Sequence, residues 1–391
     1  MTPRRCPTAA AEHDHWRWWR EQRPPAERVH LDSAAAGRSS AATLRATARH
    51  AEREAATGGY VAQAEAVPVL EEGRAALAAL LGVPAAGLAF VENAHTALDA
   101  LLGAWPLADG DAVAVVPSEW GPNLHAFAHR GLRLTELAVH GDGLLDLAEL
   151  ERALASDPPA LVHLTQVASH RPLVQPVTQA AALCRAAGVP LWVDAAQAVG
   201  HVDTATGADA VYGTSRKWLT GPRGVGMLGV AEHWWDRLQI STSDLHRANQ
   251  PAGTSQVWLL ESGEAHIAGR VGLGNAVYEL AEAGQERVWQ RLAEVGRQTR
   301  EALDGLPGWA VVAEAVPVGT GCATTALRAR NGQGIGTARA RLLHEHGIVT
   351  SGCAIGRAPR EMTEPLLRVS PHVDCTPDDL TLLRKALLAL S

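Results

Sequence analysis

Two short apolar runs that end in reactive side chains constrain the fold of this chain most. A run at 191–193 stops at Asp194, and a second run at 208–212 leads into Lys217. A glycine-rich return at 221–226 follows the lysine. Apolar runs of this length between turn residues are typical of buried strands. Because ligands bind at the carboxyl ends of strands in parallel α/β sheets, the pattern predicts that the carboxylate and the amine share one site.

The rest of the chain divides into an alternating part and a mixed part. Strand patterns alternate with helical patterns from residue 88 to residue 212, which predicts βαβ units in a mainly parallel sheet. After Val230, two long helical patterns and several short strands indicate a smaller α+β domain. We therefore expect a helical arm at 1–28 that packs on the small domain or a partner subunit, a large domain at 29–258 and a small domain at 259–391.

Composition excludes several classes of function. The 391 residues carry a formal net charge of −7 with no long basic block, so nucleic acid is not an expected partner. No apolar run reaches the roughly 18 residues of a membrane helix, and no secretory signal is recognised at the N-terminus. The five cysteines are scattered without a Cys-x-x-Cys pair, which favours a reducing cytoplasm and neither a disulfide framework nor a metal site.

The chemistry of the first two runs points to one cofactor. A lysine can form a Schiff base with an aldehyde, and a carboxylate can hold a protonated pyridine nitrogen, which together are what pyridoxal 5'-phosphate requires. Taken alone, an aspartate at a strand end or a lysine before a turn is usually structural. The two residues in this order, Asp194 and then Lys217, favour the functional interpretation.

Two further strand ends add weaker signals. The strand at 88–91 runs into Asn93, Ala94 and His95 and then a helix, whose free backbone N–H groups could seat a phosphate. Trp120 follows the strand at 112–116, where an aromatic ring could stack on a flat cofactor. Packing in the core is an equally good interpretation of Trp120 from the sequence alone.

Motifs along nearly the whole chain resemble one enzyme family. The segments LDSAA, DAAQ, SRK and GPRG, which begin at residues 31, 194, 215 and 221, are similar to those of the class V aminotransferase group of pyridoxal-phosphate enzymes. This resemblance implies the fold-type-I transferase architecture, with a large domain built on a mainly parallel seven-stranded sheet and a smaller α+β domain. It also implies a cytoplasmic homodimer.

The resemblance assigns roles to individual residues. It implies that Lys217 carries the Schiff base, that Asp194 pairs with the pyridine nitrogen and that Arg368 binds the α-carboxylate of the substrate. The remaining cofactor contacts that it implies are a stacking ring, partners of the phenolic oxygen and ligands of the phosphate: Trp120, Gln197, Ser169, Asn93, Ala94, His95, Thr214 and Arg216. Further expected substrate contacts are Ala35, Tyr60, His170 and Trp258.

Within the family, six segments most resemble the carbon–sulfur lyases of ergothioneine biosynthesis. They include GGYVAQAEA at 58–66, GPNLHAF at 121–127 and APREMTEPLLRVSPH at 358–372. The resemblance implies β-elimination of hercynylcysteine sulfoxide, an amino-acid-derived substrate. The products would be the sulfenic acid that leads to ergothioneine, together with pyruvate and ammonia.

Two alternatives stay open at this point. A cysteine desulfurase would act on free cysteine and build a persulfide on Cys353, although the surrounding SGCAIGRAP does not reproduce the desulfurase pattern. A catalytically silent member of the fold would serve as a binding module, which the intact Lys217, Asp194 and Arg368 disfavour. Glu261 stands where many relatives have a threonine that completes the neighbouring subunit's phosphate site.

Overall fold

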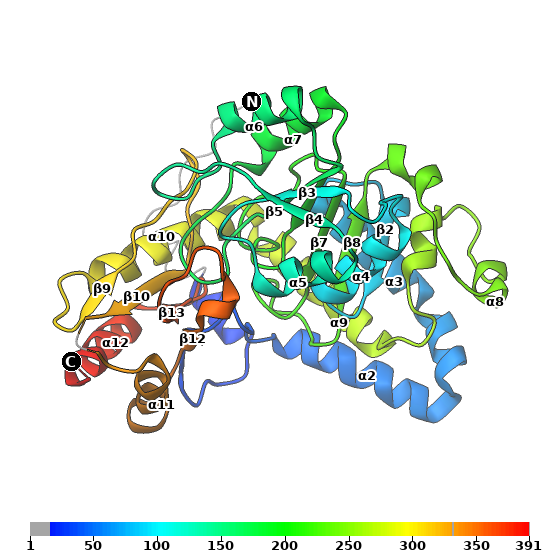
Figure 1. The fold of residues 1–391 in the computed structure, drawn as a ribbon. Coiled ribbons are helices and arrows are strands. Elements are labelled where there is room, and N and C mark those ends of the chain that lie inside the picture. The colour runs from blue at the N-terminus through cyan, green and yellow to red at the C-terminus, as the bar shows by residue number, and fades with distance from the viewer. Residues whose placement is uncertain (1–15, 331, 391) are drawn as a thin grey trace, which may run out of the picture.

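A seven-stranded sheet lies at the centre of the protein (Figure 1). The computed structural model describes residues 16–330 and 332–390. The strand order is β2-β8-β7-β6-β5-β3-β4, in which only β8 runs antiparallel to its neighbours. The strands are β2 (Leu88–Val91), β3 (Ala112–Val115), β4 (Arg133–Glu136), β5 (Leu161–Thr165), β6 (Leu191–Asp194), β7 (Ala210–Thr214) and β8 (Gly226–Val230). The expected mainly parallel sheet is confirmed.

Helices cover both faces of this sheet because successive side chains of each strand point to opposite sides. Trp192 of β6 belongs to the apolar core formed with α4 (Ala94–Ala104) and α5 (Gly121–His129). Leu191 and Val193, its neighbours in the strand, belong to the core on the other face, with α6 (Leu147–Ser156) and α7 (Val177–Ala187). The strands are therefore buried on both sides, and only their ends are available for a site.

Three long helices pack together beside the sheet: α2 (Ala41–Thr57), α3 (Gly59–Leu81) and α9 (Ile267–Ala283). Helix α3 contains Pro68. A proline removes one backbone hydrogen bond, and close packing of the helix offsets the loss. A Cβ on Gly73 would lie 3.3 Å from the Cα of Gly274, so α3 and α9 approach closely here.

A four-stranded antiparallel sheet forms the core of the C-terminal part (Figure 1). The short α8 (Asp244–Ala248) precedes α9 in the chain. The elements are β9 (Trp309–Val311), β10 (Thr325–Ala329), β12 (Ser351–Cys353), β13 (Leu366–Val369), α10 (Gln285–Leu303), α11 (Ile335–His346) and α12 (Pro377–Ala389).

The N-terminal segment joins the C-terminal part rather than the large sheet. β1 (Val29–His30) pairs in parallel with β11 (Ile348–Val349). Of the helical arm predicted at 1–28, helix is seen from residue 16 to residue 21, and residues 1–15 lie outside the described part of the chain. The Trp19 ring stacks on His372, with ring centroids 5.3 Å apart. Segments far apart in sequence therefore enclose the space between the two sheets.

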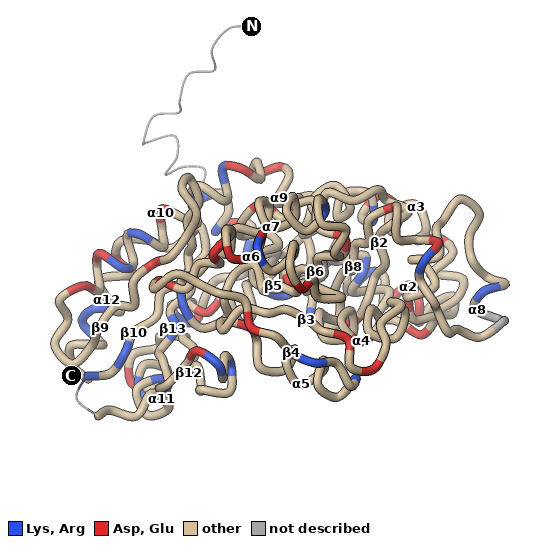
Figure 2. Tube along the Cα trace, turned by 45° about the horizontal axis from the view of Figure 1, so that its top comes forward, with Lys and Arg blue, Asp and Glu red and all other residues tan. Residues whose placement is uncertain are grey.

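The charge distribution agrees with the composition. Figure 2 shows basic and acidic residues interspersed along the trace. Among the described residues, no helix combines the length and the apolar character that crossing a membrane requires. The same residues contain no group of three or more His, Cys, Asp or Glu side chains arranged to hold a metal ion.

Candidate active site

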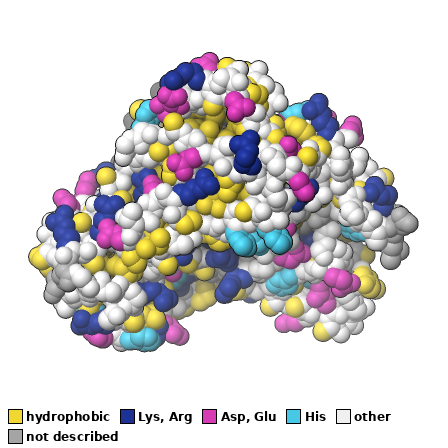
Figure 3. Space-filling view, in the orientation of Figure 1, with side chains coloured by type: hydrophobic (Ala, Val, Ile, Leu, Met, Phe, Trp, Pro, Cys, Tyr) yellow, Lys and Arg dark blue, Asp and Glu magenta, His cyan; other side chains and the backbone are white. Residues whose placement is uncertain are grey.

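A cavity of about 480 Å³ opens where β6 and β7 end and where α4 and α5 begin. Figure 3 shows that the molecular surface is hollowed between the C-terminal part and α2, with Lys or Arg side chains gathered near the hollow. All ten residues that the sequence assigned to the cofactor line the cavity, as do Ala35 and Arg368: Asn93, Ala94, His95, Trp120, Ser169, Asp194, Gln197, Thr214, Arg216 and Lys217.

Asp194 ends β6 and is 4% exposed. One carboxylate oxygen accepts a hydrogen bond of 2.8 Å from the Ala196 amide, and the other accepts one of 2.9 Å from the Asn123 side chain. Burial raises the pKa of Asp194, and the charge of Lys217 opposes that shift. A buried carboxylate is costly without a cationic partner, so this position suits a protonated ring nitrogen.

A buried polar network lies behind Asp194, and the sequence analysis missed it. Asn123 also donates a 2.9 Å hydrogen bond to Glu119, and Thr165 donates one of 2.6 Å to the same carboxylate oxygen. The other oxygen of Glu119 lies 2.9 Å from His163 Nδ1, and His163 Nε2 lies 2.8 Å from the Tyr212 hydroxyl. Glu119 and Asn123 are four residues apart, and this spacing in the sequence could have indicated a contact between their side chains. The network fixes the orientation of Asp194.

Lys217 lies in the turn after β7, and its amine has an unusually low pKa of about 7. Burial is the largest cause, and Arg216, Arg368 and Arg357 lower the pKa further, whereas Asp194 raises it. A lysine with such a pKa is partly neutral near pH 7, as a nucleophile or a base must be.

The turn that carries Lys217 is tightly enclosed. The Thr220 amide donates to the Lys217 carbonyl at 3.0 Å, and Thr220 has a φ of 56°, in the left-handed region. A Cβ on Gly37 would lie 2.4 Å from the same carbonyl, so only glycine fits there. The small-residue turn at 33–37 therefore lets the backbone approach the lysine closely.

The expected phosphate seat is the start of α4. The Asn93 side chain accepts hydrogen bonds from the amides of His95 and Thr96, at 2.9 and 3.1 Å, and caps the helix. A Cβ on Gly226 would lie 2.9 Å from Asn93 Cα, so the glycine-rich return lets β8 pass this loop. The positive end of the helix dipole faces the cavity and favours an anion.

Two buried polar atoms at the cavity lack a protein partner. Ser169 Oγ and Arg368 Nε are both buried without a hydrogen bond among the described residues. The other Arg368 nitrogens are held: Nη1 donates to the Ser169 carbonyl at 2.7 Å, and Nη2 donates to Asp32 at 3.3 Å. Gln197 donates to the Ala34 carbonyl at 2.9 Å, which leaves its second amide N–H available. This donor set fits a phosphorylated pyridine aldehyde and an amino-acid carboxylate.

Three residues assigned to the substrate lie outside the lining of this cavity. Tyr60 is 78% exposed on α3 and bonds to Glu264 at 3.1 Å. His170 lies in a neighbouring cavity of about 290 Å³, 2.7 Å from Glu361, and Trp258 stacks on His246. Sequence proximity to a motif does not fix the direction of a side chain, so the predicted contacts of these three residues are not made within this cavity.

Cys353 lies outside the cavity lining as well. It is fully buried in an apolar cluster with Val312, Ala326 and Met362, and its sulfur lies 4.0 Å from the Ser169 carbonyl. Arg357, four residues later, does line the cavity. Sequence analysis missed Arg357 and Arg223 as lining residues, although both belong to quoted motifs.

Glu261 has partners within its own chain. Its carboxylate is buried and pairs with Arg74 at 2.5 Å and with Arg270 at 2.9 Å. The Phe90 amide donates to it at 3.1 Å. Glu261 therefore fastens β2 to α3 and α9.

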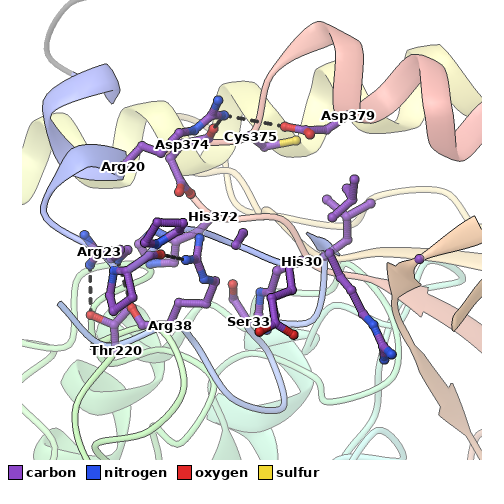
Figure 4. Close-up of a pocket in the computed structure, with 18 of the residues that line it drawn as sticks. Arg20, Arg23, His30, Ser33, Arg38, Thr220, His372, Asp374, Cys375 and Asp379 are labelled. Atoms are coloured by element: carbon purple, nitrogen blue, oxygen red, sulfur yellow. Dashed lines mark hydrogen bonds and ion pairs between the residues drawn. The ribbon is translucent and has the colours of Figure 1, made fainter. Parts of the chain in front are cut away.

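A second cavity, of about 530 Å³, lies beneath the N-terminal arm (Figure 4). Arg23 crosses it to donate to Thr220 Oγ1 at 3.2 Å, and Arg20 pairs with Asp379 at 3.6 Å. Both guanidinium groups therefore tie the arm to the rest of the protein. The contact with Thr220 also supports the turn that carries Lys217.

Comparison with known proteins decides the family. The model of the aminotransferase class-V family matches residues 29–383. The chain belongs to this family. Membership confirms the resemblance that the motifs indicated and the prediction of an enzyme that depends on pyridoxal phosphate.

Individual relatives agree with this assignment. The chain is 45% identical to a probable hercynylcysteine sulfoxide lyase of Mycobacterium tuberculosis, over 95% of this chain and 92% of that protein. It is 28% identical to a cysteine desulfurase of Serratia proteamaculans, over 71% and 73% of the two chains. The structure of the cysteine desulfurase CsdA from Escherichia coli superposes with a TM-score of 0.82 at 20% identity, covering 95% of this chain and 97% of that one. The superposition confirms the fold.

Proposed function

We propose that this protein is a carbon–sulfur lyase that cleaves hercynylcysteine sulfoxide by β-elimination. The observation that carries the proposal is the composition of the cavity: Lys217 and Asp194 line it, whereas Cys353 does not. The 45% identity to a protein named for this activity supports the same substrate. We also propose, as the motifs predicted, a homodimer in the cytoplasm.

Each residue has a definite task in the proposed reaction. Pyridoxal phosphate, when bound, supplies an electron sink for the electrons of the Cα–H bond. Lys217 would hold the cofactor aldehyde and would accept the Cα proton, which its lowered pKa of about 7 permits. Asp194 would keep the ring nitrogen protonated. Arg368 orients the substrate through its carboxylate, as a planar guanidinium does best.

The start of α4 and the residues around it would hold the phosphate. Asn93 caps the helix, and Thr214 and Arg216 line the same cavity. Trp120, the N-cap residue of α5, lines the cavity and would cover the ring. These groups position the reacting atoms and exclude water, and they take no part in proton transfer.

The decisive experiment compares two substrates. The purified holoenzyme is incubated with hercynylcysteine sulfoxide and, separately, with free cysteine, while pyruvate and the released sulfur product are measured. We expect pyruvate from the sulfoxide in amounts equal to the sulfenic acid formed. Alanine and sulfide or persulfide from cysteine, without cleavage of the sulfoxide, would replace this proposal with the desulfurase.

A further inference from the structure

Arg357 is a half-buried cation of the catalytic cavity to which no role has yet been given. It ends the short 3-10 helix η4 (Ile355–Arg357), directly after β12 and Cys353. Within the described residues, its guanidinium has no hydrogen bond to a side chain and no carboxylate within ion-pair distance. A partly desolvated guanidinium without a partner is costly, so its place in the cavity calls for an anionic or strongly polar ligand.

The other cavity arginines differ from Arg357 in their surroundings. Arg216 donates to the Ala35 carbonyl, and Arg368 is fixed by Ser169 and Asp32. Arg223 is exposed and belongs to the glycine-rich return that passes the Asn93 loop, at the expected phosphate end. Arg357 is thus the half-buried guanidinium whose N–H groups remain available.

The position of Arg357 is at the substrate end of the cavity. Its charge is close enough to lower the pKa of the Lys217 amine, and it also acts on Arg368. Its helix packs against the first turn of α5, where a Cβ on Gly121 would lie 2.1 Å from the Gly356 carbonyl. Gly121 directly follows Trp120. The guanidinium therefore belongs to the region near the lysine, the carboxylate-binding arginine and the stacking ring.

We propose that Arg357 binds the sulfoxide oxygen of the substrate and stabilises the sulfenate that leaves. This inference rests on the proposed lyase function. As Lys217 takes the Cα proton, the Cβ–S bond breaks and its electron pair stays with the leaving R–S–O group. Negative charge then grows on the oxygen, and no oxidant or reductant is needed in this step. The guanidinium forms a charge-assisted hydrogen bond that strengthens as the bond breaks.

Arg357 would also decide which substrates the enzyme accepts. A thioether substrate has no oxygen for the guanidinium to bind, and its thiolate would leave without this help. Cys353 is fully buried and does not line the cavity, so the same segment offers a cation and not a nucleophile to the substrate. Arg357 is therefore a residue that selects sulfoxides over thioethers.

The test uses Arg357→Met and Arg357→Lys in the holoenzyme with two substrates, hercynylcysteine sulfoxide and β-chloro-L-alanine. Chloride leaves without a hydrogen-bond donor, so it reports on the lysine and the cofactor alone. We expect Arg357→Met to lower kcat for the sulfoxide about 100-fold, the cost of losing one oxyanion donor. β-Chloroalanine turnover should fall much less, because the charge of Arg357 is only one of several causes of the lowered pKa of Lys217. Arg357→Lys should recover part of the loss because it restores the charge without the fork.

Matched controls separate the outcomes. Arg360→Met, three residues away and outside the cavity lining, should behave as wild type, and all variants should keep the visible absorbance of the bound cofactor. Equal losses for both substrates, or unchanged sulfoxide turnover in Arg357→Met, would overturn the role of Arg357 alone. A wild-type enzyme that eliminates chloride but never cleaves the sulfoxide would remove the proposed function as well.

Discussion

The two sheets contribute different halves of the catalytic cavity. The large sheet supplies Asp194 and Lys217 from the ends of β6 and β7, and these are the groups that we propose act on the cofactor. The C-terminal part supplies Arg357 and Arg368, to which we assign contacts with the substrate. Asp194 and Lys217 reach the cavity because they follow buried strands directly. The positions of Arg357 and Arg368 in the cavity depend on how the C-terminal part packs against the large sheet. Chemistry and substrate choice therefore reside on separate structural elements.

The substitution Lys217→Ala tests the half of the cavity that the large sheet contributes, and it should have the largest effect. Loss of the amine removes both the Schiff base and the base, so turnover should fall by about 10³-fold or more. Pyruvate release and the visible absorbance of the purified protein measure the two losses. Lys385 is the chain's other lysine and is exposed on α12, so Lys385→Ala is the matched control. Wild-type absorbance in Lys217→Ala would contradict the assignment.

Arg368→Lys tests the C-terminal half with a smaller expected effect. The lysine keeps the charge but loses the fork that can grip a carboxylate, so KM should rise about 10–100-fold with a smaller change in kcat. Steady-state kinetics with the sulfoxide measures both. Arg328→Lys, on the exposed part of β10, is the control. An unchanged KM would move the carboxylate contact elsewhere in the cavity.

The pKa of Lys217 predicts how the site affects stability. Because its folded pKa of about 7 is below the ordinary 10.5, the unfolded chain binds more protons between these values. The stability of the cofactor-free protein should therefore rise as pH increases from 7 to 10. The variant Lys217→Met lacks this amine and should have a higher Tm than the wild type at pH 7. The difference in Tm between the two proteins should shrink as the pH rises to 10. A Tm difference that is independent of pH would contradict the buried, partly neutral amine.

The smallest expected effect belongs to Cys353→Ala. The thiol is buried away from the cavity, so pyruvate release from the sulfoxide should stay close to that of the wild type. Stability should fall modestly, because a small side chain leaves less apolar contact in the cluster with Met362. Loss of turnover without loss of the fold would restore the persulfide mechanism.

The structure also shows where reading the sequence has limits. The sequence analysis named His170 and Trp258 as expected substrate contacts. In the fold, His170 lies by Glu361 in a separate cavity, and Trp258 packs on His246. A motif fixes the path of the backbone more firmly than the direction of each side chain. Trp258→Ala with an unchanged KM would confirm that this ring does not hold the substrate.

The sequence alone determined the elements that depend on local pattern. The apolar runs before Asp194 and Lys217 are typical of buried strands, and strand ends in parallel sheets share an edge. In the structure these runs form β6 and β7, and both side chains line one cavity. A helix after β2 followed from the same logic, although α4 begins at Ala94, within the residues expected to form the turn.

Only the tertiary structure decided what depends on contacts between distant segments. It buried Cys353 and presented Arg357 to the cavity, because β12 packs in the C-terminal sheet while η4 rests against α5. It also joined Glu119, Asn123 and Asp194 into one network across separate elements. The direction of such side chains is set by packing between segments hundreds of residues apart, which a local pattern does not encode.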